Sequence, residues 1–591
     1  MRFFQKPQLL KVKQDNIFDF KIKVTKILFF IGFIIVFGKI FTLQIINYPK
    51  YEKVDRKTKF AKIIIPGERG KILDKNGRIL AFDLPSYSLY FDTWMIKNLR
   101  EKNPSYLNYL CENLSRILKM EKEEIEKLMN KPYSLIKKNL KFEEYIEIKE
   151  KKLKGIYTEK SYKRVYPYGR HLCHIIGYTD TDRNGLEGVE YFYNSFLRGS
   201  NGIYLVLKDG LGNLIPSIKK EISREKKGKD IVLTIDSNVQ FIVEEEIKKG
   251  YEKFNPKNIS VIVMDADNGE IIALANYPNF DPNNPGEYDF SIIKNKCVTD
   301  LFEPGSIFKI VTAASAIEEN LFRPDTIIMC EYGKWFVRNH YLHDVHPYGA
   351  LTFKEVVAKS SNIGTVKIAM ALGEKKLYEY CKKFRFGEKT GIDLPGETAG
   401  IFRPLYKWSS YSITAIPIGQ EVGITAVQGI RAISVFANGG YLVRPHVIKE
   451  IKGEETYEIE RYKNEKIRII SSKTVEIVRD MLKEVVSEEG TASSAKIEGY
   501  NIYGKTGTAQ KAINGKYVKG KYVSSFVGFL LSNKKNIAIS VNVDEPKGKY
   551  FGGIVAAPIF RDILIRIINY YEISPEKNLK MVYKDETKRT D

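Results

Sequence analysis

A run of 20 mostly apolar residues, 27–46, is the feature that most restricts how this chain can fold. As a helix the run is about 30 Å long, which matches the hydrocarbon core of a bilayer. A single segment in lipid satisfies its own backbone hydrogen bonds only as a helix. Lys39 interrupts the run, and its long side chain can extend toward the interface. No small-residue cleavage site follows, so we predict an uncleaved signal-anchor, with a cleaved signal peptide as the alternative.

The 591 residues allow more than one domain beside this helix. Residues 1–24 predict a short basic tail, residues 25–46 the membrane anchor, and residues 574–591 a polar tail without regular structure. Between them we predict a mixed domain of helices and strands over residues 47–240, which we call the pedestal. A second globular domain is predicted over residues 255–573.

The pedestal pattern alternates between strands and helices. Residues 69–81 carry an Asn-Gly pair between two apolar stretches, which predicts a strand, a tight turn and a strand. The charged, amphipathic segments 106–128 and 142–153 predict helices. Residues 185–190 open a further helix that is predicted to end at Leu197.

The second domain predicts an antiparallel sheet with a helical block inserted into it. Its strands come from both ends of the domain, at residues 259–264, 270–276, 506–512, 523–531 and 537–543. Helices are predicted at residues 353–359, 365–372 and 556–571. Asn514 and Gly515 predict a hairpin turn. The fold class is therefore α/β, in the sense of a segregated α+β arrangement.

Charge and cysteine content exclude several classes of protein. The net charge is +23, but the lysines are spread along the whole chain, which indicates a solvated Lys/Glu-rich surface, and no nucleic-acid partner is predicted. Five cysteines without a C-x-x-C pair predict neither a disulfide framework nor a zinc site. His340, His343, Asp344 and His346 form a small cluster, but further ligand groups are not evident, so we do not predict a metal.

Ser306 and Lys309 form the sequence S-I-F-K at the start of an apolar stretch that predicts a helix. Residues three apart on a helix lie on the same face, so the lysine amine can reach the serine hydroxyl. A serine hydroxyl is a weak nucleophile until a base takes its proton. A lysine becomes such a base when its pKa falls from about 10.4 toward neutrality. Ser306 alone is equally compatible with a helix N-cap.

Two more motifs follow in the chain, S-S-N at residues 360–362 and K-T-G-T at residues 505–508. Taken singly, Ser360 and Asn362 are ordinary turn residues, and Lys505 is an ordinary strand lysine. Their occurrence together, in this order after Ser306, predicts a catalytic serine site.

Residues 499–506 also match G-x-x-x-x-G-K-T, the pattern of a phosphate-binding loop. Such a loop needs a strand before it and a helix after it. The residues after Lys505 predict a strand and a hairpin instead, so we do not predict a nucleotide site. In the serine-site interpretation, Gly507 lets a ligand lie close against the edge of the strand.

The three motifs together resemble those of penicillin-binding proteins and class A β-lactamases. Over residues 26–571 the chain is similar to class B penicillin-binding proteins, because residues 69–81, 164–167 and 185–190 resemble the pedestal motifs of that family. Residues 299–306 (T-D-L-F-E-P-G-S) and 550–558 (Y-F-G-G-I-V-A-A-P) resemble its division-specific, FtsI-type branch. The resemblance implies a serine acyl-transferase fold of the penicillin-binding/β-lactamase type, preceded by a transmembrane helix and an elongated mixed pedestal.

The implied reaction is D,D-transpeptidation of peptidoglycan stem peptides that end in D-Ala-D-Ala, together with covalent binding of penicillin. The resemblance implies that Ser306 attacks the penultimate D-Ala carbonyl and that Lys309 takes the serine proton. Ser360 would relay a proton toward the leaving amine, and Lys505 would support it with positive charge.

The resemblance also implies which groups hold the substrate. Asn362 would hydrogen-bond the substrate backbone or Lys309. Thr506 and Thr508 would bind the terminal carboxylate, with Gly507 between them, and the backbone N–H groups of Ser306 and Thr508 would form the oxyanion hole. No metal and no organic cofactor is implied.

The substrate of that family lies outside the cytoplasmic membrane. We therefore expect a single-pass protein of the cell inner (cytoplasmic) membrane, with its N-terminus inside and its catalytic domain outside; lysines on both sides of the span do not decide the orientation. Expected partners are stem peptides, β-lactams, a SEDS-type glycosyltransferase and other division proteins. The alternatives are an elongation-specific class B transpeptidase, a membrane-anchored β-lactam sensor or β-lactamase, and a catalytically silent scaffold.

Overall fold

The computed structural model describes residues 9–50, 60–131, 135–208, 214–453, 466–513 and 515–575. Asn514 of the predicted hairpin turn, residues 1–8 of the first predicted tail and residues 576–591 of the second lie outside the described residues. The chain forms two compact units, Met1–Pro66 with Asn201–Lys226, and Gly67–Ser200 with Lys227–Asp591.

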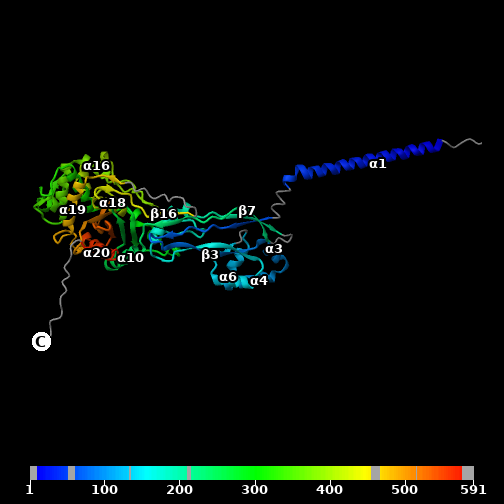
Figure 1. The fold of residues 1–591 in the computed structure, drawn as a ribbon, viewed down its shortest axis with the longest axis horizontal. Helices are drawn as coiled ribbons and strands as arrows, with labels where there is room; N and C mark the ends of the chain where they lie inside the picture. The colour runs from blue at the N-terminus through cyan, green and yellow to red at the C-terminus, as the bar shows by residue number, and fades with distance from the viewer. Residues whose placement is uncertain are drawn as a thin grey trace, which may run out of the picture. The chain divides into compact units, whose positions relative to one another are not determined.

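The first unit contains the N-terminal helix and a small sheet (Figure 1). Helix α1 (Leu9–Phe41) continues into one π-helical segment, η1 (Thr42–Ile46). Within them, Phe18–Ile46 is long and apolar enough to cross a membrane, and the predicted anchor lies inside this segment. The sheet is antiparallel with the order β1-β6-β7, formed by β1 (Phe60–Ile65), β6 (Gly202–Lys208) and β7 (Leu214–Ser223).

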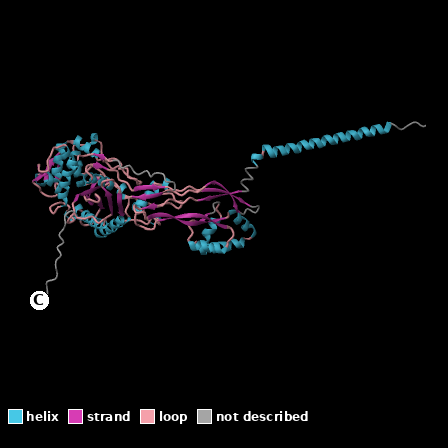
Figure 2. Cartoon of the chain, viewed as in Figure 1, coloured by secondary structure: helices cyan, strands magenta, loops and turns pink. Residues whose placement is uncertain are grey.

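A five-stranded antiparallel sheet is the centre of the larger unit, and helices enclose it (Figure 2). Its order is β10-β9-β20-β19-β18, with β9 (Asn258–Asp265), β10 (Ile271–Tyr277), β18 (Ile502–Ile513), β19 (Lys516–Leu530) and β20 (Ile537–Asp544). All five predicted strands are confirmed, and they do come from both ends of the domain. The fold class is confirmed with them.

Both faces of this sheet are buried, because apolar side chains alternate along β9 toward two separate cores. Val261 and Val263 pack toward α10 (Ser237–Phe254) and α20 (Gly552–Tyr570). Ile262 and Met264 pack toward α13 (Lys309–Glu318) and α18 (Ala426–Ala437) on the other face. The sheet is therefore the middle layer of a three-layer domain.

The inserted block is mostly helical. It also contains the short strand pairs β11 (Ile327–Met329) with β14 (Ala350–Thr352), β12 (Lys334–Val337) with β13 (His340–His343), and β15 (Tyr441–Leu442) with β17 (Ile467–Arg468). Its other helices are α11 (Phe290–Ile293), α12 (Lys296–Thr299), α14 (Phe353–Ala358), α15 (Asn362–Leu372), α16 (Glu374–Lys383), α17 (Ser412–Ala415) and α19 (Ser472–Val486).

A second sheet, of six strands, belongs mainly to the pedestal. Its order is β16-β8-β2-β3-β4, with β5 also paired to β3, and its strands are β2 (Ile72–Leu73), β3 (Ile79–Phe91), β4 (Leu135–Lys137), β5 (Ile156–Val165), β8 (Asp230–Leu233) and β16 (Ile448–Lys452). The predicted hairpin is confirmed, since β2 pairs with β3 in antiparallel fashion. Strand β16 comes from the predicted second domain, which sequence patterns did not indicate.

The pedestal helices are α3 (Thr93–Lys102), α4 (Pro104–Leu118), α5 (Lys122–Met129), α6 (Phe142–Lys151), α7 (Cys173–Ile176), α8 (Gly188–Phe192) and α9 (Asn194–Leu197). Helices α4 and α6 lie beside β3 (Figure 1).

Two segments that were predicted as single helices are each divided into two helices, so these predictions were wrong. Segment 106–128 is broken because Lys119 adopts a left-handed φ of 55° that ends α4, and the helix toward Leu197 is interrupted at Tyr193.

A buried network of charges holds the pedestal motifs together. The Arg69 guanidinium donates to Glu190 Oε2 at 2.6 Å, and Arg164 Nε donates to Glu190 Oε1 at 2.7 Å. Asp83 pairs with Arg164 at 3.3 Å and with Arg183 at 2.7 Å. Glu190 is fully buried, so each of its oxygens replaces lost water with a charged donor. The three motifs at residues 69–81, 164–167 and 185–190 thus meet at one point.

We expect Glu190→Gln to destabilise this part of the protein, because two buried guanidinium groups would then face a neutral amide. Removing one partner of a buried ion pair costs about 3–5 kcal/mol. Thermal unfolding of the full-length protein in detergent, followed by circular dichroism, should show a clearly lower melting temperature. The matched control is Glu147→Gln, because Glu147 and Arg116 pair with 42% and 64% of their side chains exposed. That pair contributes at most about 1 kcal/mol, and equal melting temperatures for both variants would contradict the role of the network.

Candidate active site

Ser306 lies in a 3-10 turn, η3 (Gly305–Phe308), directly before α13. The expected α-helical start is thus replaced by a tighter turn. Gly305 has a φ of +52°, a backbone conformation that favours glycine. A Cβ atom there would also lie 3.2 Å from the carbonyl oxygen of Thr508, so the close packing favours glycine as well. Within the described part of the chain, the Ser306 hydroxyl makes no hydrogen bond. It is partly exposed and lines a cavity.

The Lys309 amine is buried, with 1% of the residue exposed, and Lys309 follows the turn that carries Ser306. Its Nζ donates to the backbone oxygen of Ser360 at 2.7 Å and to Asn362 Oδ1 at 2.7 Å, and it lies 3.2 Å from Ser360 Oγ. Burial lowers the pKa of Lys309 to about 7, while the negative charge of Asp344 acts in the opposite direction. A substantial fraction of this lysine is therefore neutral near pH 7 and has a lone pair that can accept a proton.

Ser360 receives hydrogen bonds from both lysines of the site. Lys505 Nζ donates to Ser360 Oγ at 2.9 Å, and Lys309 Nζ donates to the same oxygen at 3.2 Å. Ser360 adopts a left-handed φ of +57°, which costs a non-glycine residue about 1–2 kcal/mol. The two lysines occupy the acceptor positions of its hydroxyl, so its own proton is free to be donated elsewhere. Asn362 is the first residue of α15 and not part of the preceding turn, contrary to the predicted boundary.

Lys505 lies inside strand β18 and is completely buried. Burial and the positive charge of Lys309 hold the pKa of Lys505 well below its usual range. The chain continues as a strand beyond Lys505 to Ile513, where a phosphate-binding loop would begin a helix. Residues 499–506 therefore do not form a nucleotide site of that type.

Thr506 and Thr508 line the cavity from β18. The Thr508 hydroxyl accepts a hydrogen bond from the Gly552 N–H at 3.0 Å, and Thr506 Oγ1 lies 3.1 Å from Thr491 Oγ1. The accepted bond leaves the Thr508 hydroxyl proton available to an anionic ligand.

Gly507 is required by packing within the protein itself, in addition to the role toward a ligand that the sequence suggested. A Cβ atom at this position would lie 2.8 Å from the carbonyl oxygen of Pro304 and 2.3 Å from Ser525 Oγ. Both distances are shorter than carbon–oxygen contacts allow. The glycine lets β18 approach the protein's own loop before Ser306, and a role for Gly507 toward substrate stays a prediction.

Asp344 also belongs to this site, and its structural role was not predicted from the sequence. Its Oδ1 accepts the backbone N–H groups of Asn362 and Ile363, and its Oδ2 accepts the Ser361 hydroxyl at 2.6 Å. It thereby caps the N-terminus of α15 and fixes Asn362 against Lys309. Asp344 directly follows strand β13, which contains His340 and His343, and precedes His346; these residues form the small cluster for which no metal is predicted. The described residues contain no group of His, Cys, Asp and Glu side chains arranged to hold a metal ion.

The cavity in front of these groups has a volume of about 720 Å³. Ser306, Ser360 and Asn362 lie on its lining together with the two threonines of β18, while Lys309 and Lys505 lie behind the lining. Tyr522 and Tyr550 form part of its wall and stack with ring centroids 4.2 Å apart. An exposed serine hydroxyl, two buried lysines with lowered pKa values and hydroxyl donors on an edge strand are the components of a serine acyl-transfer site.

Comparisons with known proteins agree with this geometry. Residues 259–565 match the family model of the penicillin binding protein transpeptidase domain, and residues 64–233 match that of the penicillin-binding protein dimerisation domain. Stage V sporulation protein D of Bacillus subtilis is 34% identical over 566 residues, which cover 92% of this chain and 86% of the relative.

Two further similarities concern a named enzyme and a solved structure. The peptidoglycan D,D-transpeptidase FtsI of Buchnera aphidicola is 30% identical over 588 residues, covering 98% of this chain and all of the relative. The crystal structure of penicillin binding protein 3 from Mycobacterium tuberculosis, complexed with aztreonam, aligns with a TM-score of 0.68 at 26% identity, covering 87% of this chain and 98% of that one.

Proposed function

This chain belongs to the class B, FtsI-type penicillin-binding proteins, a family of peptidoglycan D,D-transpeptidases, and we propose that Ser306 is the nucleophile of its acyl transfer. The observation that carries the assignment is the buried Lys309 amine, held at 2.7 Å by Asn362, three residues after the cavity-lining serine in the chain. A lysine kept partly neutral in this position supplies the base that a serine hydroxyl needs.

In the first half-reaction the Ser306 proton passes to the lone pair of Lys309 as Oγ bonds to the penultimate D-Ala carbonyl carbon. The bond from this carbon to the terminal D-Ala nitrogen then breaks. The leaving nitrogen takes a proton from the Ser360 hydroxyl, which is replenished from the two lysines that donate to it. In the second half-reaction the amine of a neighbouring stem peptide attacks the ester carbonyl. It loses a proton to the same relay, and Ser306 leaves as a hydroxyl.

Substrate recognition is proposed to use strand β18. The Thr506 and Thr508 hydroxyls line the cavity and offer donors to the terminal carboxylate of the donor peptide. The backbone N–H groups of Ser306 and Thr508 would stabilise the oxyanion, supported by the close approach of Gly305 to Thr508. Lys505 adds positive potential behind the hydroxyl of Ser360.

β-Lactams are proposed to react at the same serine, because their strained amide presents the carbonyl that the D-Ala-D-Ala bond would present. The relative solved with aztreonam supports this, since aztreonam is a β-lactam. We expect wild-type protein incubated with fluorescent penicillin to carry the label on the peptide that contains Ser306, and Ser306→Ala to carry none. Labelling that persists in Ser306→Ala would contradict the assignment, and rapid release of hydrolysed drug would indicate a β-lactamase.

The rate of this acylation should depend on pH through Lys309. Its pKa is lowered to about 7, and only the neutral amine accepts the serine proton. The second-order rate constant should therefore rise roughly tenfold per pH unit below that pKa and level off above it.

The Lys309→Ala variant should acylate about 10²–10⁴ times more slowly than the wild type, with an unchanged circular dichroism spectrum. Lys367→Ala is the matched control, because that lysine pairs with Glu331 on the outer side of α15. A pH-independent rate in the wild type would show that another group is the base.

The biological role is proposed to be septal cell-wall synthesis, with the N-terminus inside the cytoplasmic membrane and the catalytic domain outside. The FtsI-like segments at residues 299–306 and 550–558 support this, together with the similarity to a named FtsI. Helix α1 is proposed to contact a SEDS-type glycosyltransferase. Gly32 and Gly38 leave open space beside the helix, where another helix can pack closely.

Depletion of the protein in its native cell tests this role. We expect filaments with unfinished septa, because crosslinking at the division site would stop while side-wall growth continues. Rounded cells that still divide would indicate the elongation branch. Normal division with a defect only in sporulation would match the similarity to stage V sporulation protein D and would equally contradict the septal proposal.

A further inference from the structure

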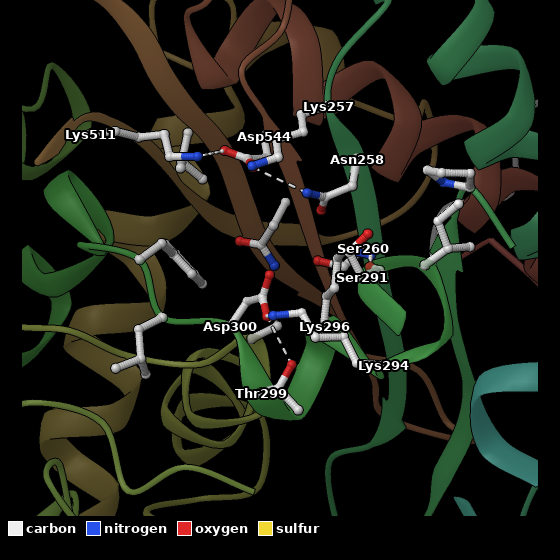
Figure 3. A pocket seen from close by; sticks show the side chains of 17 residues that line it. Lys257, Asn258, Ser260, Ser291, Lys294, Lys296, Thr299, Asp300, Lys511 and Asp544 are labelled. Atoms are coloured by element: carbon white, nitrogen blue, oxygen red, sulfur yellow. Dashed lines mark hydrogen bonds and ion pairs between the residues drawn. The ribbon is translucent and has the colours of Figure 1, made fainter. Parts of the chain in front are cut away.

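A second cavity, of about 540 Å³, shares none of the lining residues of the catalytic cavity, although its residues 302, 511 and 523 are sequence neighbours of residues 303, 510 and 522 of the other. Figure 3 shows the side chains that line it. Four strands of the central sheet contribute to it, β9, β18, β19 and β20, and helices α11 and α12 cover another side. Its lining includes residues 299–302, the segment that leads directly to Ser306. The comparisons give this cavity no role.

Basic side chains dominate the charged lining of this cavity. Four lysines and two aspartates line it: Lys257, Lys294, Lys296, Lys511, Asp300 and Asp544. Both aspartates are already paired, Asp300 with Lys294 at 2.6 Å and Asp544 with Lys511 at 2.7 Å. Asp544 also accepts a hydrogen bond from Asn258 at 3.1 Å (Figure 3). Among the described residues, Lys257 and Lys296 make no ion pair, so the cavity carries an excess of positive charge.

Lys296 is the unusual member of this group, because only 8% of it is exposed. Its ammonium donates one hydrogen bond, to the backbone oxygen of Ser291 at 2.6 Å, and has three protons to donate. Burial lowers the pKa of Lys296, with the charge of Asp300 opposing the shift. A buried cation without a counter-ion in contact is unfavourable unless an anion reaches it.

Asn542 provides a second unsatisfied group on the same lining. It is 5% exposed, its Nδ2 donates to Ser540 Oγ at 3.1 Å, and its Oδ1 is buried without a hydrogen-bond partner. Because this oxygen is not accessible to solvent, it is an unsatisfied polar atom in the wall of the cavity and does not itself contact a ligand.

We propose that this cavity binds a small oxyanion, a phosphate or a carboxylate group, between Lys257 and Lys296. Lys257 is exposed at the rim and can guide the anion, while Lys296 meets it inside. The ligand supplies the missing counter-charge to Lys296 and an acceptor for its remaining protons. The anion can come from free inorganic phosphate or from a dicarboxylate, and the two sources differ in charge and shape.

Calorimetric titration of the full-length protein in detergent, once with inorganic phosphate and once with succinate, tests the proposal. We expect saturable binding of at least one anion, weakened by added sodium chloride. Lys296→Met and Lys257→Met should each weaken it by about tenfold, since each removes a charged hydrogen bond. Lys257 is exposed, so its substitution cannot act through unfolding. Lys519→Met is the matched control, because it makes the same charge change at an exposed position of β19 outside the cavity.

Binding of phosphate alone would assign a phosphate ligand, and binding of succinate alone a carboxylate ligand. Two results would overturn the proposal. One is the absence of saturable binding of either anion to the wild type. The other is equal affinity in the wild type, Lys257→Met, Lys296→Met and Lys519→Met, which would place the bound anion elsewhere, for example in the catalytic cavity.

Discussion

The proposed active site depends on the burial of one amine. Lys309 Nζ is removed from water and held by the backbone oxygen of Ser360 and by Asn362 Oδ1, both of which are acceptors without a full charge. Neutral acceptors cannot offset the cost of burying an ammonium ion, so the pKa falls to about 7. The left-handed backbone at Ser360 and the Asp344 cap of α15 both serve to keep these acceptors in place.

In the pedestal, burial of cationic side chains has the opposite result, because these side chains keep their charge. Arg69 and Arg164 are as buried as Lys309, but each contacts a carboxylate oxygen of Glu190. A guanidinium group cannot lose its proton under these conditions, so the fold provides a counter-charge. Burial therefore produces a rigid charged junction where a carboxylate is present, and a reactive neutral base where it is absent. Lys296 is an intermediate case, because it is buried and its one hydrogen-bond acceptor, the backbone oxygen of Ser291, carries no full charge.

The central sheet brings the reactive groups together. Strand β18 is the last in the order β10-β9-β20-β19-β18, so its outer edge is not paired with another strand of that sheet. Gly507 allows this strand to pack against the Pro304 carbonyl, which sets Thr508 beside the turn that carries Ser306. An edge strand has free backbone N–H and C=O groups, which suits a site that must hold an extended peptide.

The sequence by itself determined the local elements and the chemistry. The apolar segment, the strands of the central sheet and the hairpin of β2 and β3 were predictable because each depends on hydrophobic periodicity or turn residues within a short window. The three motifs indicated a serine site because each is a short pattern of residue types that can be recognised in the chain, whatever the distance between them. Only the tertiary structure decided the burial of Lys309, the capping role of Asp344, the pairing of β16 with β8 and the reason for Gly507. Each of these joins residues far apart in the chain, and solvent exclusion and packing between distant segments have no signal in a local pattern.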